Sequence, residues 1–397
     1  MIPLNSSQKD TVLKKMAELI ALNKQTILEA NQKDIDTYSG DDKAMYDRLI
    51  VNNQKVEGMV SSLHQLISDK DPINQKRYEF THDNGMKIVN KTAPFGTVMI
   101  IYESRPDVTV EAAGIAFKSG NKILLKGGKE SLNSNLAIVD LWHQALEENN
   151  ISKDWVVYLN YDRARTQKFL KNPSQPIDLI VPRGGEKLIA FVKQNASCPV
   201  IVSGRGNNFV YVAEEADLDI ALNLINNGKT AKISACNAVD KVLINSQLKN
   251  KDSFIKNLVN TLKESNVEIS GDQATSQFEH VDPIASEDIW YEEFLDYKIV
   301  IGQVDATHEA IEKINKYSGG HSAVIVSKND TEADQFMAAV DTAAVYQNAS
   351  SRFTDGGQFG LGGELAISTD KLHHRGPMGL HDLVTNKWYI KGNGQIR

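Results

Sequence analysis

The feature that most constrains this chain is a regular alternation of short apolar runs with helical patterns between residues 94 and 202. The apolar runs have strand length and lie at residues 98–102, 122–126, 156–159, 177–181 and 199–202. Between them, residues 108–118, 133–148 and 187–194 have helical patterns. Strands that alternate with helices at this spacing predict a parallel α/β sheet, whose ligands bind at the carboxyl ends of the strands.

A second series of the same kind follows. Its apolar runs lie at residues 209–212, 241–244, 298–301, 323–326 and 343–346, and helical patterns cover residues 253–263 and 307–316. A chain of 397 residues is too long for a single hydrophobic core. The sequence therefore predicts at least two α/β units.

Composition limits the partners of the chain. The formal net charge of -7 disfavours a nucleic-acid or anionic-membrane partner, because both need a basic face. No apolar run approaches the ~18 residues that a membrane span needs, and the first ten residues lack the pattern of a secretory signal. Two cysteines at unrelated positions form neither a disulfide framework nor a metal cluster. We expect a soluble cytoplasmic protein without a metal.

The first 93 residues precede this alternation. Helical patterns at residues 7–31 and 44–67 predict a scaffold packed on a core. Asn84-Gly85, flanked by alternating side chains over residues 78–91, predicts a β-hairpin with positive φ at both turn residues. The hairpin is either a device for pairing subunits or a simple surface ribbon.

Cys236 lies in a loop of small residues with two lysines just upstream. Positive charge and backbone N–H groups favour the thiolate, which is the nucleophilic form of cysteine. In this hypothesis Lys229 and Lys232 supply the charge. The alternative is that Cys236 is a buried small hydrophobic residue. Cys198, which precedes a proline at a predicted strand start, is interpreted as structural.

Two predicted strand ends carry groups that suit phosphate. Arg183, Gly184 and Gly185 lie at a strand-to-helix turn, where the N–H groups of the helix attract anions. Lys126 and Lys129 follow another strand, with no carboxylate in the turn itself, and suit a 2′-phosphate better than a ribose diol. The alternatives are a tight connection at the first turn and a solvated basic turn at the second.

Several stretches together resemble the aldehyde dehydrogenase superfamily, and within it most closely the gamma-glutamyl phosphate reductase family. The resemblance runs nearly end to end and rests on residues 102–109, 125–130, 181–185, 234–237, 345–363 and 375–380. The family pattern near residues 311–325 is altered, with Lys313, Gly319 and Ala323 in place of the expected histidine, hydroxyl and acidic residues.

The resemblance implies a fold of two parallel-sheet α/β lobes. Residues 1–77 and 94–204, with part of 365–385, would bind NADPH, and residues 205–364 would form the catalytic domain around the cysteine. Residues 78–93 and 386–397 would form an oligomerisation hairpin with a C-terminal strand. A homodimer or homotetramer is expected.

The resemblance also implies a reaction. Cys236 would attack the acyl carbon of L-glutamyl 5-phosphate, expel phosphate and form a thioester, which hydride from NADPH reduces to L-glutamate 5-semialdehyde for proline biosynthesis. For the cofactor it implies Lys126 and Lys129 at the adenosine ribose and its phosphate, Arg183, Gly184 and Gly185 near the pyrophosphate, and Glu293 at the nicotinamide ribose. A glutamate 5-kinase that supplies the substrate is the implied partner.

The substrate carries a carboxylate, an ammonium group and an acyl phosphate. Arg105 and Arg352 are the candidate anion partners, because arginine presents a forked and permanently charged donor. Asn348 and Ser350 are candidates for the amino-acid end. For Arg352 the alternative is an ion pair with Asp355.

Residues 201–206 contain no carboxylate, although the resembling segment of acid-forming aldehyde dehydrogenases carries the glutamate that activates water. An enzyme that keeps its thioester for hydride should lack that base. Two alternatives stay open: a hydrolytic semialdehyde dehydrogenase, and a non-catalytic metabolite-binding protein on the same fold.

Overall fold

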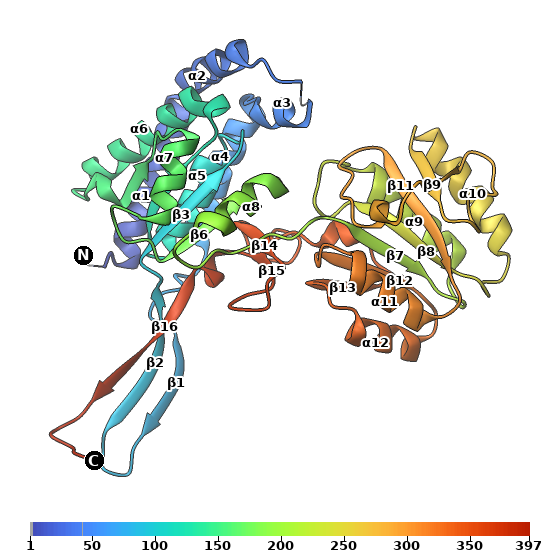
Figure 1. Cartoon of the computed structure of the whole chain (residues 1–397). Helices are drawn as coiled ribbons and strands as arrows, with labels where there is room; N and C mark the ends of the chain where they lie inside the picture. The colour runs from blue at the N-terminus through green and yellow to red at the C-terminus, as the bar shows by residue number, and fades with distance from the viewer. Residues whose placement is uncertain (1–2, 42) are drawn as a thin grey trace. The chain divides into compact units, whose positions relative to one another are not determined.

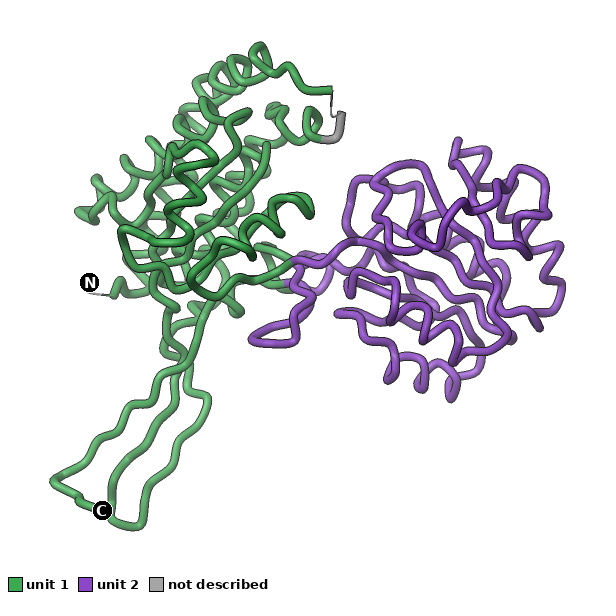
Figure 2. The backbone as a smooth tube through the Cα atoms, in the orientation of Figure 1, with its two compact units in different colours: residues 1–202, 360–366, 378–397 green, residues 203–359, 367–377 purple. Residues whose placement is uncertain are grey.

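The computed structural model describes residues 3–41 and 43–397, and the chain divides into two compact units (Figure 2). Unit 1 contains residues 1–202, 360–366 and 378–397, and unit 2 contains residues 203–359 and 367–377. The division after residue 202 lies close to the predicted boundary at 204. The functions assigned to the two lobes stay predictions.

Unit 1 begins with four helices (Figure 1). They are α1 (Ser6–Leu22), α2 (Lys24–Thr37), α3 (Lys43–Leu49) and α4 (Asn53–Ser68). Each predicted helical region is therefore divided in two. A buried carboxylate joins this scaffold to α6 (Leu132–Glu148), because Asp34 of α2 accepts hydrogen bonds from Asn133 and Ser134 at the start of that helix.

A four-stranded parallel sheet forms the centre of unit 1, in the order β5-β4-β3-β6. Its strands are β3 (Thr97–Tyr102), β4 (Lys122–Lys126), β5 (Val156–Tyr158) and β6 (Leu179–Arg183), and the further helices of the unit are α5 (Val108–Lys118), α7 (Arg163–Lys171) and α8 (Glu186–Asn195). Short 3₁₀ turns are η1 (Lys129–Ser131), η2 (Lys153–Trp155) and η5 (Leu380–Asp382).

Alternating side chains of β3 explain why both faces of this sheet are covered. Val98 and Ile100 pack with residues of α1, α4, α5 and α6. Met99 and Ile101 pack with residues of α7 and α8. The predicted parallel sheet is confirmed, except that residues 199–202 form only an isolated bridge, between Val200 and Ile180.

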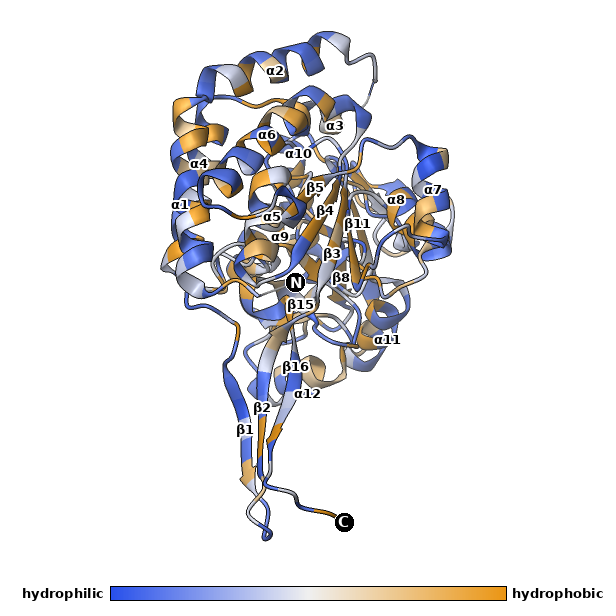
Figure 3. Cartoon of the chain, turned by 90° about the vertical axis from the view of Figure 1, so that its left-hand side faces the viewer, coloured by the Kyte–Doolittle hydropathy of each residue, from blue (hydrophilic) through white to orange (hydrophobic). Residues whose placement is uncertain are grey.

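A three-stranded antiparallel ribbon extends from unit 1 (Figures 1 and 3). Its strands are β1 (Lys76–Thr81), β2 (Lys87–Pro94) and β16 (Val384–Lys391), with β2 in the centre. The predicted hairpin is confirmed, but its turn is not the expected one. Gly85 has φ +83°, whereas Asn84 does not have a positive φ. The turn spans His82 to Met86, because the Asn84 side chain accepts the Met86 N–H and the ladder closes at His82.

Unit 2 is built on a seven-stranded sheet in the order β10-β9-β11-β8-β7-β12-β13, with parallel pairing throughout. Its strands are β7 (Asn208–Val212), β8 (Val239–Asn245), β9 (Glu268–Gly271), β10 (Asp282–Pro283), β11 (Lys298–Val304), β12 (Ser322–Val326) and β13 (Ala344–Gln347). Its helices are α9 (Leu218–Thr230), α10 (Lys251–Glu264), α11 (Thr307–Tyr317) and α12 (Asp330–Ala339), with η3 (Glu287–Trp290) and η4 (Ser351–Phe353).

Two apolar clusters cover the two faces of this second sheet. Val210 and Val242 pack with α9 and α10, and Phe209 and Leu243 pack with α11 and α12. The strands β14 (Ala366–Ser368) and β15 (Gly376–Met378) pair where the chain passes between the units. Within the described residues, no helix is long and apolar enough to cross a membrane.

Candidate active site

Cys236 lies in the loop that joins α9 to β8, and its side chain is exposed. The backbone beneath the thiol is held in place. The buried Asn208 donates from Nδ2 to the carbonyl oxygens of Cys236, at 2.8 Å, and of Ala238, at 2.6 Å. The alternative interpretation of Cys236 as a buried hydrophobic residue is wrong. This cysteine presents sulfur to solvent from an anchored loop.

Gly206 makes close contact with the same loop. A Cβ at Gly206 would lie 2.1 Å from the Cys236 carbonyl oxygen and 2.5 Å from its Cα. Real Cβ atoms do not approach backbone so closely, so glycine is required here by contact. The segment without a carboxylate, residues 201–206, therefore ends directly against the nucleophile.

Asn237 joins the cysteine loop to the loop that follows β13. Its Nδ2 donates to the carbonyl oxygens of Arg352, at 3.2 Å, and Thr354, at 3.0 Å. In return, the Ser351 hydroxyl donates to the Asn237 carbonyl oxygen at 2.8 Å. Three hydrogen bonds therefore tie the loop that carries Cys236 to the loop that carries Arg352.

Arg352 has the features of an anion-binding side chain. Its Nη1 is buried and has no hydrogen-bond partner in the described part of the chain. The expected alternative, an ion pair with Asp355, does not form: Asp355 accepts the N–H groups of Gly357 and Gln358 instead. Burial lowers the pKa of Arg352, and the charges of Cys236 and Asp355 partly offset this effect. An anionic ligand would satisfy the orphaned donor.

Ser350 and Asn348 already have protein partners. The Ser350 hydroxyl donates to Asn227 Oδ1 at 2.9 Å and accepts the Arg352 N–H, so it caps the turn that carries the arginine. Both ends of the Asn348 amide bond to the backbone of Ser327. These hydrogen bonds shape the loop. Both side chains use them to bind other parts of the protein and not a ligand.

The expected role of Lys229 is wrong. Its ammonium group is fully buried and pairs with the equally buried carboxylate of Asp240, at 2.8 Å. Because its charge is balanced by Asp240, Lys229 does not supply positive charge to the Cys236 thiol. Lys232 is exposed on the loop.

In unit 2 the candidate residues lie at the opposite edge of the sheet from the expected one, which was the edge formed by the carboxyl ends of the strands. Gly206, Cys236 and Glu293 precede β7, β8 and β11, so they lie at the amino ends of parallel strands. Glu293 is half-buried. In unit 1, by contrast, Arg105, Lys126 and Arg183 lie at the carboxyl ends of β3, β4 and β6 or just beyond them, as expected.

A carboxylate occupies the predicted pyrophosphate position in unit 1. Glu103 Oε2 accepts the Gly185 N–H at 2.9 Å, at the N-terminus of α8, and the Glu103 carboxyl group lies against Gly184. This N–H is therefore taken by Glu103, which must turn away before a phosphate binds there. Arg183 and Arg105 both act to lower the pKa of Glu111, so the two guanidinium groups lie near that carboxyl group.

The turn after β4 has close backbone contacts. Gly128 approaches the Ser104 N–H, and the buried Ser104 hydroxyl has no partner among the described residues. Lys126 is half-buried and Lys129 exposed. The Glu130 carboxylate, next in sequence, lies against Gly128, so the turn is not free of negative charge. The two lysines, the arginines and the orphaned hydroxyl fit a phosphorylated dinucleotide.

Glu111, in the first turn of α5, was not singled out from the sequence. Its pKa is raised to about 7, mainly by burial and then by Asp107, while Arg183 and Arg105 act in the opposite direction. A titrating carboxyl group at the carboxyl edge of the sheet is typical of ligand sites.

A buried polar chain supports the arginine loop. His321 Nδ1 bonds to the Ser322 hydroxyl at 2.8 Å, which bonds to Thr354 Oγ1 at 2.7 Å, and the Tyr346 hydroxyl meets the same Thr354 atom at 2.7 Å. Burial lowers the pKa of His321 to about 4, so the ring is neutral. The chain fixes Thr354, which bonds to Asn237.

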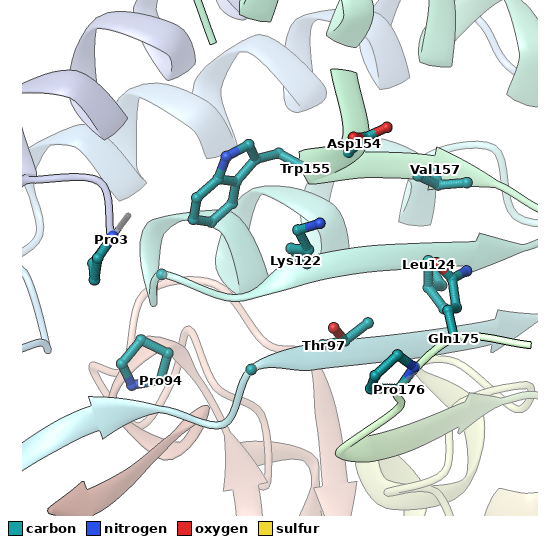
Figure 4. A pocket seen from close by; sticks show the side chains of 12 residues that line it. Pro3, Pro94, Thr97, Lys122, Leu124, Asp154, Trp155, Val157, Gln175 and Pro176 are labelled. Atoms are coloured by element: carbon teal, nitrogen blue, oxygen red, sulfur yellow. The ribbon is translucent and has the colours of Figure 1, made fainter. Parts of the chain in front are cut away.

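A cavity of about 630 Å³ in unit 1 contains none of these residues (Figure 4). It lies at the amino ends of β3 and β4, where Thr97, Lys122 and Trp155 line it. Because none of the candidate residues lines it, this cavity is not the candidate site. In the described residues no cluster of His, Cys, Asp and Glu is suited to a metal.

The residues that hold the site together were not predicted from the sequence. Asn208, Asn237, Asp240 and Lys241 are all buried polar residues around the cysteine loop. One signal was present in the sequence: Asp240 and Lys241 are consecutive charges at the start of an otherwise apolar strand, and buried charges need partners.

The chain is similar to known proteins over nearly its whole length. Residues 3–289 match the Aldehyde dehydrogenase family. A crystal structure of propionaldehyde dehydrogenase from Rhodopseudomonas palustris, with bound CoA and an acylated cysteine, shares the fold at 15% identity and a TM-score of 0.67, covering 97% of this chain and 92% of that one. The chain is a member of the aldehyde dehydrogenase family.

Two relatives narrow the family. Gamma-glutamyl phosphate reductase from Clostridium botulinum is 41% identical over 396 residues, 99% of this chain and 95% of the relative. The crystal structure of gamma-glutamyl phosphate reductase from Thermotoga maritima has a TM-score of 0.94 at 40% identity, with 99% and 95% of the two chains covered. Within the aldehyde dehydrogenases, the chain belongs to the gamma-glutamyl phosphate reductase family.

Proposed function

We propose that this chain reduces L-glutamyl 5-phosphate to L-glutamate 5-semialdehyde with NADPH, releasing phosphate through a thioester on Cys236. One observation carries the proposal: an exposed thiol on an anchored loop lies beside an arginine whose buried Nη1 has no partner. The names of the relatives support the same reaction.

Acylation needs a nucleophile and a place for the oxyanion. The Cys236 thiolate attacks the acyl carbon, and the carbon–oxygen bond to phosphate breaks, with the electron pair leaving on phosphate. Phosphate is a good leaving group, so no strong general acid is required. The Cys236 N–H is a proposed oxyanion donor, and one such donor contributes about 3 kcal/mol.

NADPH supplies the hydride when it is bound. The chain must then preserve the thioester until reduction, and residues 201–206 support this because they contain no carboxylate to activate water. After reduction the carbon–sulfur bond breaks, the sulfur keeps the electron pair, and the aldehyde leaves.

Arg352 and Arg105 are the proposed partners of the substrate anions. Arg352 is the stronger candidate, because its donor is desolvated without compensation in the protein. We propose an indirect role for Ser350, which shapes the turn around Arg352, and for Asn348, which anchors the same loop to Ser327.

The cofactor is proposed to bind through unit 1, with Lys126 and Lys129 at the ribose phosphate and Arg183, Gly184 and Gly185 at the pyrophosphate. Glu293 is the proposed partner of the nicotinamide ribose. If Lys129 recognises the 2′-phosphate, Lys129→Glu raises the KM for NADPH and leaves the KM for NADH unchanged. Equal effects on both cofactors would contradict this assignment.

The reverse reaction tests the proposed function. With pyrroline-5-carboxylate, the cyclic form of the semialdehyde, the protein should produce NADPH only when phosphate or arsenate is present. Cys236→Ala should abolish turnover and retain NADPH binding. Equal turnover without phosphate or arsenate would favour a hydrolytic dehydrogenase, and turnover by neither route would favour a metabolite-binding protein.

We propose a cytoplasmic homodimer or homotetramer that pairs through the ribbon of β1, β2 and β16. Aromatic and aliphatic side chains on this ribbon are about half exposed: Tyr78 51%, Phe80 43%, Trp388 50% and Ile390 54%. Such apolar exposure on an uncovered sheet favours association. A monomer in light scattering would refute the proposal, and a glutamate 5-kinase remains the proposed partner for substrate delivery.

A further inference from the structure

The segment that carries Glu293 is held by side chains on both sides of that residue, and three of the four, Asn207, Asp240 and Lys241, are buried. Four main-chain groups between Trp290 and Phe294 each bond to a side chain from elsewhere in unit 2. The pairs are Asn207 Nδ2 to the Trp290 oxygen at 2.6 Å, Arg205 Nη1 to the Tyr291 oxygen at 2.8 Å, Lys241 Nζ to the Glu292 oxygen at 2.8 Å, and the Phe294 N–H to Asp240 Oδ2 at 2.8 Å.

An irregularity in β8 lets two consecutive residues reach this one segment. Neighbouring side chains of a regular strand point to opposite faces of the sheet. The pairing of β7 with β8 slips at Asp240, because Asn208 pairs with Val239 and Phe209 pairs with Lys241. A strand irregularity of this kind re-aims side chains, so Asp240 and Lys241 bond to residues on either side of Glu293.

The contacts are charged and desolvated. Lys241 is fully buried, and its Nζ lies 3.7 Å from the centre of the Phe294 ring. The other oxygen of Asp240 pairs with Lys229, at 2.8 Å. Charged hydrogen bonds in a dry interior are strong and directional, so the backbone on both sides of Glu293 has little freedom.

The same elements hold the cysteine loop. Asp240 and Lys241 follow Cys236 by four and five residues, and Arg205 precedes Gly206, whose backbone lies against Cys236. The side chains that bond to residues 290–294 therefore belong to residues that lie next to the cysteine loop, either in sequence or through Gly206.

We propose that Asp240 and Lys241 are positioning residues, which hold the Glu293 carboxylate at a fixed place relative to Cys236 for the nicotinamide ribose. This inference rests on the proposed function of Glu293. Neither side chain needs to touch the cofactor. They act through the main chain of Glu292 and Phe294.

Titration of Lys241 makes the role measurable. Its pKa is lowered to about 7, mainly by burial, with Lys229 and Arg205 acting in the same direction and Asp240 and Glu292 opposing them. Above this pH the lysine is neutral, so its hydrogen bond to Glu292 weakens and its attraction to the Phe294 ring is lost. NADPH affinity should therefore fall between pH 7 and pH 9.

The test compares Lys241→Met, Lys241→Arg and the exposed control Lys249→Met by NADPH fluorescence titration from pH 6.5 to 9. Lys241→Met should weaken NADPH binding about tenfold at pH 6.5 and remove the pH dependence, and Lys241→Arg should be nearly flat with pH. Asp240→Asn, a smaller change, should also weaken binding. Lys249→Met should match the wild type.

Hydrogen exchange of the Phe294 amide in the cofactor-free protein gives a second, independent measurement. It should accelerate in Lys241→Met and Asp240→Asn, whether or not the enzyme turns over. Faster exchange with NADPH affinity within twofold of wild type at every pH would overturn the positioning role. Wild-type protein that binds no NADPH would instead refute the proposed function.

Discussion

Replacement of Gly206 by alanine tests the geometry beneath the nucleophile. The added methyl group would lie 2.1 Å from the Cys236 carbonyl oxygen and 2.5 Å from its Cα. Ordinary contacts begin at 3.4 Å, so the cysteine loop must move by about 1 Å. Gly206 does not have a positive φ, so alanine meets no backbone strain there and the contact alone causes the effect.

A displacement of about 1 Å at a reacting atom costs on the order of 100-fold in rate, which corresponds to about 2.7 kcal/mol in the activation free energy. The expected result is a kcat roughly 100-fold below wild type in the phosphate-dependent reverse assay. Crowding in a packed region should also lower the stability by about 1–3 kcal/mol. Iodoacetamide should still alkylate Cys236, because the thiol stays exposed.

Gly58→Ala is the matched control. Gly58 lies in α4, and a Cβ there has no neighbour within 4 Å, so alanine should raise stability by up to about 1 kcal/mol and leave kcat unchanged. If Gly206→Ala keeps kcat within threefold of wild type while folded, the contact between Gly206 and Cys236 does not position the sulfur, and the reasoning is refuted.

Three further variants test charges around the two candidate sites. Arg352→Gln should raise the KM for phosphate or pyrroline-5-carboxylate about 100-fold, because a charged hydrogen bond to the substrate is lost; the Tm should not fall, since the lost guanidinium leaves no buried partner, and a large drop in Tm would show a structural role. Glu103→Gln should tighten NADPH binding several-fold in fluorescence titration, because an amide keeps a contact with Gly185 without repelling phosphate; weaker binding would contradict this view. For Glu111, the folded pKa of about 7 exceeds the unfolded value of 4.5, so the native protein binds the proton more tightly and loses stability as pH rises from 4.5 to 7. Glu111→Gln should therefore match wild type at pH 5 and exceed it at pH 8, by at most about 3 kcal/mol, and equal Tm values at pH 8 would argue against the raised pKa.

Most of the fold was predictable, because strands of a parallel sheet covered on both faces are continuous apolar runs. Residues 98–102 and 323–326 are of this kind, and both form strands. The helix α7 was missed: six of its nine residues are polar or charged, and only Thr166, Phe169 and Leu170 are buried. Periodicity is weak in such a short element.

Site residues could be predicted only where the functional group of the residue itself indicates a role. Cys236 and Arg352 were singled out because few other residue types can act as a thiol nucleophile or as a forked, permanently charged anion partner; their roles stay predictions. Lys229 was assigned wrongly because nearness in sequence does not reveal a buried partner, here Asp240. Likewise, Gly206 contacts the backbone of Cys236, which lies 30 positions later in the sequence, a closeness that only the tertiary structure reveals.

The way the ribbon is assembled constrains biosynthesis. Its central strand β2 bonds on one edge to β1, nearby in sequence, and on the other to β16, roughly 300 residues later. At about 5–20 residues per second of translation, the second edge of β2 waits roughly 15–60 s for its partner on the ribosome. Unit 2 is complete in sequence only shortly before β16 begins, because its two segments end at residues 359 and 377 and β16 starts at Val384. A nascent chain therefore exposes an unpaired strand edge until β16 emerges, so chaperone protection and the timing of subunit association should both depend on β16.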